Sequence, residues 1–306
     1  MRIENVSIPA RDGFPLAALH FVPGSIAPKA AVQFNCGTGV KKEFYSDFAS
    51  FLAHNGYAVV VYDYRGIGAS VSGSLSDMQA RLSDWGELDM AGVLDWLSGL
   101  YPESHRFVVS HSMGGQLIGL MENYALINGI VTIATGSGYW RVHPFPFRYF
   151  PLFMWSVYIP IVTLLFGYAP LKAVKSGEDL PENVARQWAR WCTNKRYMRS
   201  EFGKTLRRIY FDQITVPIQS YIFDDDPITT KDNGRGFITS YYKNSSQIGF
   251  EEIPAKSSPN GVLGHFGFFR KKIGHELWKL PLAWLDKQVA QLNALKNSGH
   301  VAHLSN

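Results

Sequence analysis

The sequence has few cysteines, few charged residues and no long run of charge of one sign. Two cysteines in 306 residues cannot build a disulfide framework, so packing must hold the core together. Charged residues make up only 18% of the chain, and the net charge is +5. The basic residues form short, dispersed clusters without a nucleic-acid-binding motif, so we expect no nucleic-acid partner. The first ten residues lack the apolar stretch of an export signal, and we expect a cytoplasmic protein.

Motifs for nucleotide and metal binding are also missing. No G-x-G-x-x-G opens a predicted helix and no G-x-x-x-x-G-K-[ST] occurs, so no nucleotide cofactor is implied. No spacing of histidines, cysteines or carboxylates matches a metal site. We therefore expect neither a cofactor nor a metal. Disorder is excluded, because 46% of the residues are hydrophobic and can bury a core.

Apolar runs typical of buried strands alternate with amphipathic segments typical of helices. This alternation predicts an α/β protein with a mostly parallel central sheet that is flanked by helices. The expected strands span residues 30–34, 57–62, 107–110, 130–134, 218–223 and 247–253, and the expected helices span residues 42–54, 81–100, 114–125 and 272–297.

One segment, residues 136–208, breaks the alternation, and we call it the lid segment. It contains no clear strand, and residues 149–171 carry no charge. That length could span a bilayer, but Pro151, Pro160 and Pro170 interrupt it, and it lies between two strands of one sheet. We favour an apolar lid inserted into a core formed by residues 1–135 and 209–306. Peripheral contact of this lid with a membrane is the intermediate alternative.

The strongest signal for function is the run Ser110-His111-Ser112-Met113-Gly114-Gly115, which follows a strand and opens a helix. It matches the G-x-S-x-G nucleophile elbow except that Ser110 replaces the first glycine. Small residues on both sides of Ser112 let the chain turn sharply and expose the Ser112 hydroxyl. Ser112 is thus the candidate nucleophile, and the extra hydroxymethyl group of Ser110 should be tolerated.

Two further motifs give the chain a resemblance to a known superfamily. The run 35–39 (Asn-Cys-Gly-Thr-Gly) lies where lidded esterases, monoacylglycerol lipases and serine aminopeptidase-like hydrolases show a His-Gly turn, with Cys36 in place of the histidine. The run 62–70 resembles their D-x-R-G-x-G-x-S loop. The chain thus resembles this branch of the α/β-hydrolase superfamily over nearly its whole length. The resemblance implies the α/β-hydrolase fold and a serine-based mechanism.

A serine nucleophile needs a base and an orienting carboxylate, and the superfamily order is serine, acid, histidine. The strand 218–223 ends at an acidic turn, where the family pattern assigns the acid to Asp226, with Asp225 as the alternative. For the base we predict His265, which lies in a Gly-flanked loop similar to the family's G-H-x-G-F-F. His111 adjoins the nucleophile, and its side chain should point elsewhere.

The remaining site predictions concern the oxyanion and the substrate. The backbone N–H groups of Met113 and Thr38 are expected to bind the oxyanion that forms on acyl attack. The aromatic content of the lid segment predicts an apolar acyl or alkyl group, with Trp140 and Trp155 as candidate substrate-binding residues.

These residues together predict a serine hydrolase that cleaves carboxylic esters with an apolar portion through an acyl-enzyme. An aminopeptidase or amidase is an alternative, in which Glu178, Asp179 and Glu182 would bind an amino group. A thioesterase on the same triad and a non-catalytic binding protein of this fold are two more. The sequence does not determine the acyl length or the oligomeric state.

Overall fold

The computed structural model describes residues 1–25 and 27–303 and is built around an eight-stranded sheet. The strand order is β1-β2-β4-β3-β5-β6-β9-β10. The strands β1 and β2 form an antiparallel hairpin, β2 is antiparallel to β4, and all other pairs are parallel. The strands are β1 (Arg2–Pro9), β2 (Pro15–Val22), β3 (Ala31–Asn35), β4 (Ala58–Tyr62), β5 (Arg106–His111), β6 (Gly129–Ile133), β9 (Ile218–Phe223) and β10 (Ile248–Ile253).

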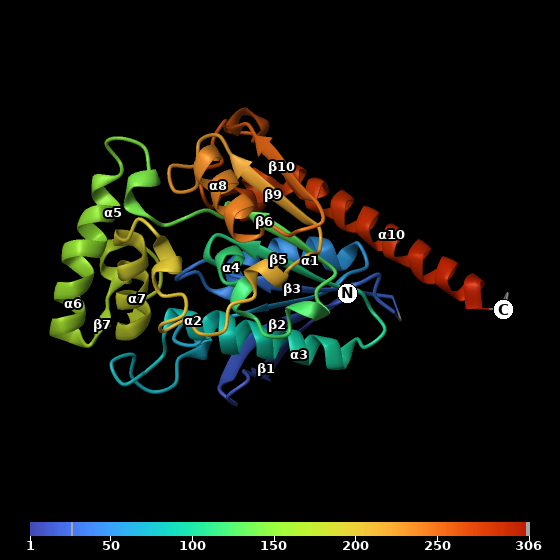
Figure 1. Cartoon of the computed structure of the whole chain (residues 1–306), viewed down its shortest axis with the longest axis horizontal. Helices are drawn as coiled ribbons and strands as arrows, with labels where there is room; N and C mark the ends of the chain where they lie inside the picture. Colours follow the sequence, from blue (N-terminus) through green and yellow to red (C-terminus); the bar gives the residue numbers. More distant parts are fainter. Residues whose placement is uncertain (26, 304–306) are drawn as a thin grey trace.

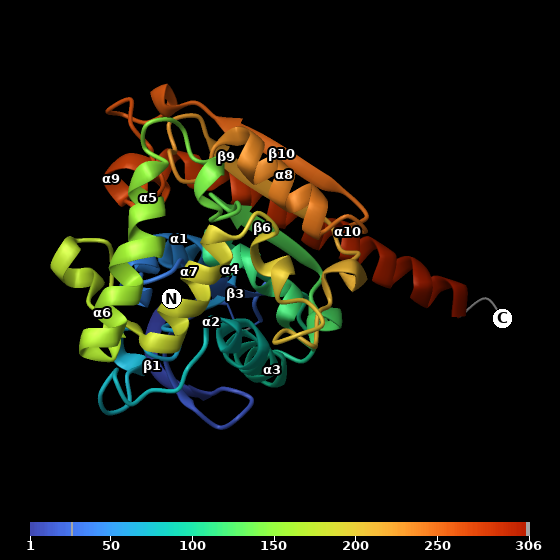
Figure 2. The same cartoon turned by 60° about the vertical axis from the view of Figure 1, so that its left-hand side comes forward.

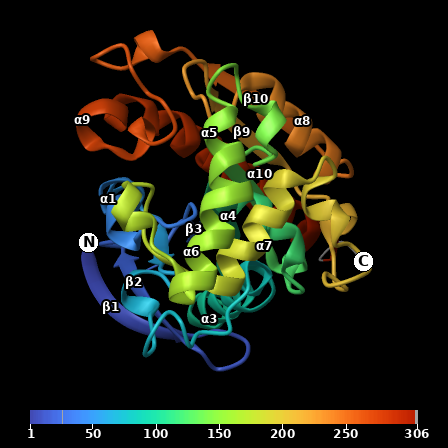
Figure 3. The same cartoon turned by 90° about the vertical axis from the view of Figure 1, so that its left-hand side faces the viewer.

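Helices cover both faces of this sheet. Figure 3 shows α1 and α9 on one side of it and α4 and α8 on the other. Every residue of β3, β4 and β6 is buried, as expected for parallel strands that are covered on both faces. The α-helices are α1 (Ser46–His54), α2 (Leu82–Asp84), α3 (Ala91–Leu100), α4 (Met113–Gln116), α5 (Tyr149–Phe153), α6 (Ile159–Phe166), α7 (Glu182–Thr193), α8 (Lys231–Tyr241), α9 (Lys271–Gly274) and α10 (Lys279–His303).

The six predicted strands are confirmed, each to within one residue at either end. The hairpin of β1 and β2 was not predicted. Its outer strand β1 is largely exposed, so it lacks the apolar run that marks the buried strands.

The predicted helix over residues 114–125 is wrong in length. Helix α4 ends at Gln116, and two short 3₁₀ turns, Ile118–Leu120 and Tyr124–Leu126, replace its continuation. The ring of Phe211 packs against Gly119 so closely that a Cβ there would lie 2.2 Å from it. The Tyr210 N–H also donates to the Gly119 carbonyl. A distant segment therefore takes the space and the hydrogen-bonding group that a longer helix would use.

The lid segment lies between β6 and β9 and adds no strand to the central sheet. Helices α5 and α6 are joined through a π-helical turn (Met154–Tyr158), so that residues 149–166 form one continuous helix. This helix is long and apolar enough to cross a membrane by length and composition. It packs beside α7 and a two-residue ribbon of β7 (Tyr168–Ala169) and β8 (Leu180–Pro181). Figures 1 and 2 show these elements grouped to one side of the sheet. The exact division at residues 135 and 208 stays a prediction.

Candidate active site

The turn between β5 and α4 carries a strained, half-buried serine. Ser112 has φ 50° and ψ −116°, a left-handed conformation that costs a non-glycine residue of the order of 1–3 kcal/mol. Gly114 and Gly115 allow this turn to pack closely, because a Cβ on either would lie 2.4 Å from Asn35 or Thr135. Ser110 is fully buried, and its hydroxyl accepts a hydrogen bond from Asn35. The serine in place of glycine is thus accommodated, as predicted.

Three side chains from different loops form one hydrogen-bonded line at this turn. Ser112 Oγ lies 2.9 Å from His265 Nε2, and His265 Nδ1 lies 2.6 Å from Asp226 Oδ2. Because the Asp226 carboxylate accepts from Nδ1–H, Nε2 is left to accept the proton of the Ser112 hydroxyl. The structure thus brings together the three residues that sequence reasoning selected from separate regions of the chain.

Asp226 is held as an ionised carboxylate. It is 3% exposed, and its second oxygen accepts from the N–H groups of Ile228 and Thr229 at 2.7 and 3.0 Å. Burial alone would raise the pKa of the Asp226 carboxyl, but the adjacent His265 and the two amides outweigh it and lower this pKa below its usual value. Asp226 therefore stays charged and can stabilise a protonated His265.

The neighbouring Asp225 and Asp224 accept hydrogen bonds from backbone N–H groups of other loops. The Asp225 carboxylate accepts from the N–H groups of Leu263 and Gly264 at 2.8 and 2.9 Å, and so holds the loop that carries His265. The alternative assignment of Asp225 as the acid has no contact with His265 to support it. Asp224 accepts from the Ala255 N–H, so it fixes the turn after β10 instead of capping the next helix.

The two predicted oxyanion donors, Thr38 and Met113, belong to two different turns. Met113 begins α4, and the first N–H groups of a helix have no acceptor inside it. Thr38 lies in the turn after β3 and lines the cavity in front of Ser112. Gly37 is required there for close packing, since a Cβ would lie 2.8 Å from His111 Nδ1. Gly39 is required for its φ of 65°, and its carbonyl accepts a hydrogen bond from the Glu178 N–H.

A buried Tyr45–His111 pair links this turn to the base loop. The Gly37 N–H donates to the Tyr45 hydroxyl at 2.9 Å, and this hydroxyl lies 2.9 Å from His111 Nδ1. His111 Nε2 lies 2.9 Å from the His265 carbonyl, which only accepts, so Nε2 carries the hydrogen and Nδ1 accepts from Tyr45. Burial, together with the nearby His265, lowers the pKa of His111 well below its ordinary value, which keeps the ring neutral.

With this geometry in place, comparison with known proteins identifies the family. The sequence model of the family described as serine aminopeptidase, S33, matches residues 26–186. The chain belongs to the serine aminopeptidase S33 family. No curated protein matches the chain in sequence.

Solved structures confirm the predicted α/β-hydrolase fold of this S33 protein. An esterase from Pyrococcus furiosus is 16% identical, with 94% of this chain and 91% of that one covered and a TM-score of 0.61. A soluble variant of monoglyceride lipase from Saccharomyces cerevisiae is 15% identical, with 94% of both chains covered and a TM-score of 0.64. Est1E from Butyrivibrio proteoclasticus, with ferulic acid bound, is 17% identical, with 93% and 99% covered and a TM-score of 0.60.

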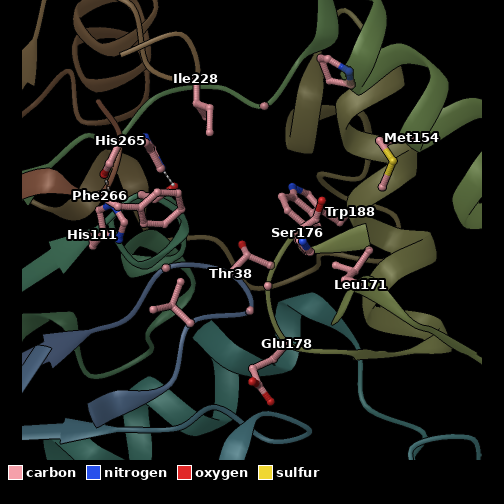
Figure 4. A pocket seen from close by; sticks show the side chains of 18 of the residues that line it. Thr38, His111, Met154, Leu171, Ser176, Glu178, Trp188, Ile228, His265 and Phe266 are labelled. Atoms are coloured by element: carbon pink, nitrogen blue, oxygen red, sulfur yellow. Dashed lines mark hydrogen bonds between the residues drawn. The ribbon is translucent and has the colours of Figure 1, made fainter. Parts of the chain in front are cut away.

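A cavity of about 710 Å³ opens in front of Ser112 and His265 in the S33 protein. Figure 4 shows His265, His111 and Phe266 on one side of it and Met154, Leu171 and Trp188 on the facing side. The first group comes from the core, and the second comes from the lid segment. The lining side chains are largely apolar, including Phe44, Phe147, Phe150, Met154, Trp155, Leu171, Trp188 and Phe266. Of the two predicted substrate-binding tryptophans, Trp155 therefore lines the cavity.

Trp140 does not line this cavity. It lies in a 3₁₀ turn (Trp140–Val142), and the guanidinium of Arg141 stacks over its ring at 4.9 Å. Trp188 lines the cavity instead, and the centroid of its ring lies 4.3 Å from the centroid of the Trp155 ring. The spacing of apolar residues along α7 did not distinguish Trp188 from a residue of the hydrophobic core.

The acidic residues predicted for an aminopeptidase are already paired. Glu178 lines the cavity, but its carboxylate forms ion pairs with Lys172 at 2.8 Å and Lys41 at 3.8 Å. Asp179 accepts from the Lys172 N–H, and Glu182 pairs with Arg186 outside the cavity. The other acidic residue in the lining, Glu43, pairs with Lys42. Among residues 1–25 and 27–303, no cluster of histidine, cysteine and carboxylate groups could hold a metal ion.

Sequence reasoning missed Tyr45 and His111 as contributors to the site. Tyr45 belongs to a segment that was predicted only as a helix, and the His111 side chain was expected to point away from the site. The two residues are 66 positions apart in the chain. A partial signal existed for His111, because a histidine at the end of a buried strand requires polar partners. The sequence gives no way to tell that Tyr45 is one of them.

Proposed function

We propose that the protein hydrolyses carboxylic esters with an apolar acyl or alkyl group through an acyl-enzyme on Ser112. The observation that carries the proposal is the hydrogen-bonded line from Asp226 through His265 to Ser112 at the inner end of an apolar cavity. A strained serine whose hydroxyl is hydrogen-bonded to a carboxylate-oriented imidazole is the arrangement that activates a hydroxyl nucleophile.

In the proposed reaction His265 acts first as a base and then as an acid. Nε2 takes the Ser112 proton while Oγ attacks the ester carbonyl, and Asp226 stabilises the resulting imidazolium. The N–H groups of Thr38 and Met113 stabilise the tetrahedral oxyanion, each by about 3–4 kcal/mol in comparable hydrolases. His265 then protonates the departing alkoxide, which leaves as an alcohol.

Water then hydrolyses the acyl-enzyme, again with His265 as base and acid. His265 removes a proton from the water, which attacks the acyl-serine carbonyl, and the second tetrahedral intermediate collapses to release a carboxylic acid. The proton on His265 returns to Ser112, so that no cofactor is consumed and the enzyme is restored.

Charge in the cavity favours an ester over an aminopeptidase substrate. Glu43 and Glu178, the acidic residues of the lining, are both paired with lysines. Lys175 and Arg270 lie in the same lining, where they would repel a protonated amino group. An acyl-thioester on a phosphorylated carrier is the second candidate, because these basic groups would attract its phosphate.

The test is a paired assay of the wild type and Ser112→Ala. The substrates are p-nitrophenyl esters from acetate to palmitate, an aminoacyl anilide and an acyl-thioester. We expect ester turnover that falls by about 10⁴–10⁶-fold in Ser112→Ala, with the anilide untouched. Equal turnover by both proteins, or a folded wild type that cleaves only the anilide, would overturn the proposal. Ser110→Ala, two residues away in the same turn, is the matched control and should retain activity.

A further inference from the structure

The lid segment exposes an unusual share of large hydrophobic side chains. In the described part of the chain, ten of the seventeen exposed large hydrophobic residues lie between Phe145 and Val174. Scattered single exposures are ordinary, whereas a contiguous set marks a surface that another apolar phase covers. Six exposed apolar residues along one side of the long lid helix form what we call the outer lid face. They are Phe150, Phe153, Val157, Ile161, Leu164 and Leu165.

The outer lid face is one stripe along a helix. Its residues recur at intervals of three or four along α5, the π-helical turn and α6, which places them on the same side of the helix. Leu164 is 78% exposed and Leu165 is 68% exposed. Figure 3 looks onto this side of the molecule and shows α5 and α6 in front, with no other part of the described chain over them.

The opposite side of the same helix is already occupied. Met154 and Ile159 are buried, and α6 and the π-helical turn pack against α7. Only 28% of the segment Tyr149–Phe166 is buried. A helix that is fixed along one side and apolar on the other is suited to lie on a membrane surface, since crossing a bilayer would strip it from α7.

The charged residues near the outer lid face indicate what kind of surface covers it. Residues 123–177 contain no aspartate or glutamate, and their charged residues are Arg141, Arg148, Lys172 and Lys175. Two of these, Arg148 and Lys172, lie directly beyond the two ends of the uncharged run 149–171, and Lys172 also pairs with Glu178. Basic groups beside an apolar helix face attract the anionic headgroups of a lipid layer. A second copy of the chain would instead bring the basic residues of two lid segments together, which is unfavourable.

The outer lid face also adjoins the cavity. Phe150 is 54% exposed and lines the cavity as well, and Phe266, 39% exposed, lines it from the base loop. The stripe therefore reaches the cavity wall at its Phe150 end. A lipid layer in that position would hold apolar esters at the entrance to the cavity.

We propose that the outer lid face docks on an anionic lipid surface, with the cavity mouth directed into the headgroup region. The docking itself stands on the exposed apolar stripe and its basic flanks. The delivery of an ester from that surface to Ser112 rests in addition on the proposed function.

The experiment measures vesicle binding in the Ser112→Ala background, so that no hydrolysis enters the readout. The probes are phosphatidylcholine vesicles with and without about one quarter phosphatidylglycerol, separated from free protein by sedimentation. The test variant is Leu164→Gln with Leu165→Gln. The matched control is Leu100→Gln with Leu295→Gln, because these leucines are also exposed but lie away from the lid.

We expect binding to the anionic vesicles to exceed binding to the neutral ones by about tenfold or more, because charge and apolar area act together. The lid variant should lose about tenfold in affinity and the control less than about twofold. The proposal is overturned if the wild-type lid does not bind anionic vesicles, or if the lid variant binds as well as the control. It is also overturned if the stripe instead forms a dimer that the lid variant abolishes in sedimentation. Because binding is scored without turnover, failure of the ester assay would leave this result independent.

Discussion

The two walls of the cavity are built in different ways. On the core side, hydrogen bonds fix each group of the candidate triad, and the Tyr45–His111 pair joins the turn after β3 to the base loop. On the lid side, Met154, Leu171 and Trp188 contribute apolar surface to the same cavity. In the proposed reaction, the core therefore holds the reacting groups in place, and the lid side sets the shape and polarity of the space for the substrate.

The sharpest way to test the core wall is to separate the two neighbouring aspartates. Asp226→Asn should lower kcat by about 10⁴-fold, because an amide no longer holds the His265 tautomer that accepts the serine proton. Asp225→Asn should cost about tenfold or less, since Asp225 contacts only backbone N–H groups of the base loop. Steady-state kinetics on one p-nitrophenyl ester checks both. A larger loss from Asp225→Asn would mean that the acid is misassigned.

The lid wall is tested by a substitution that reduces the volume of the cavity. Met154→Trp adds bulk to the cavity, and we expect long-chain esters to slow by about 10- to 100-fold while acetate esters change little. Val157→Trp is the matched control, because Val157 lies three residues further along the same helix and is 41% exposed. A chain-length series of esters gives the readout. Equal effects of the two variants would contradict the role of this wall in selecting the acyl group.

A smaller effect is expected from loosening the Tyr45–His111 pair. Tyr45→Phe leaves the Gly37 N–H and His111 Nδ1 without a partner, so the oxyanion turn and the base loop should lose alignment. We expect kcat to fall by about tenfold with KM nearly unchanged, as for a positioning residue. Tyr57→Phe is the control, since it also removes one hydroxyl hydrogen bond, to Asp286, but away from the site. A rise in KM alone would contradict the positioning role.

The smallest expected effect is on the free energy of unfolding. It is tested with one histidine from each wall of the cavity, His111 from the core and His143 from the lid segment. Burial lowers the pKa of His111 and His143 below the ordinary 6.5, so both are neutral in the folded protein and gain a proton on unfolding in acid. Stability is therefore lost as the pH falls below 6.5, at up to about 1.4 kcal/mol per pH unit for each such histidine. The unfolding free energy from urea titrations at pH 7.5 and 5.5 measures this loss. His111→Asn and His143→Asn should each reduce it, His111→Asn by more, and an unchanged pH dependence would contradict the assignment.

Sequence alone was sufficient where the signal was local. Ser112 was selected because it follows a strand inside a short, Gly-flanked motif, the acidic turn because it follows β9, and His265 because it lies in a Gly-flanked loop. The strands were found because parallel strands are continuous apolar runs. The pairing of Tyr45 with His111 could not be predicted from the sequence, because it depends on how β5 and the helical turn after β3 are placed in space. The early end of α4 was missed for the same reason, since Phe211 and Tyr210 come from nearly a hundred residues away.

The lid segment shows a different limit of sequence reasoning. Its apolar residues were expected to cover the cavity, and Trp155 does so. Composition does not separate that inward side from the outward side, however, because both are equally hydrophobic. Exposure of Leu164 and Leu165 became evident only once α7 was seen to occupy the other face of the helix.

The most direct test of the central claim is covalent labelling of the folded wild type with a fluorophosphonate, followed by peptide mass spectrometry. A serine activated by a hydrogen-bonded imidazole attacks phosphorus without needing the right acyl chain, so the lid does not decide the outcome. The account predicts a single adduct on Ser112 that disappears when Asp226 is replaced by Asn. An adduct on another serine, or a folded protein that takes up no label, would contradict it.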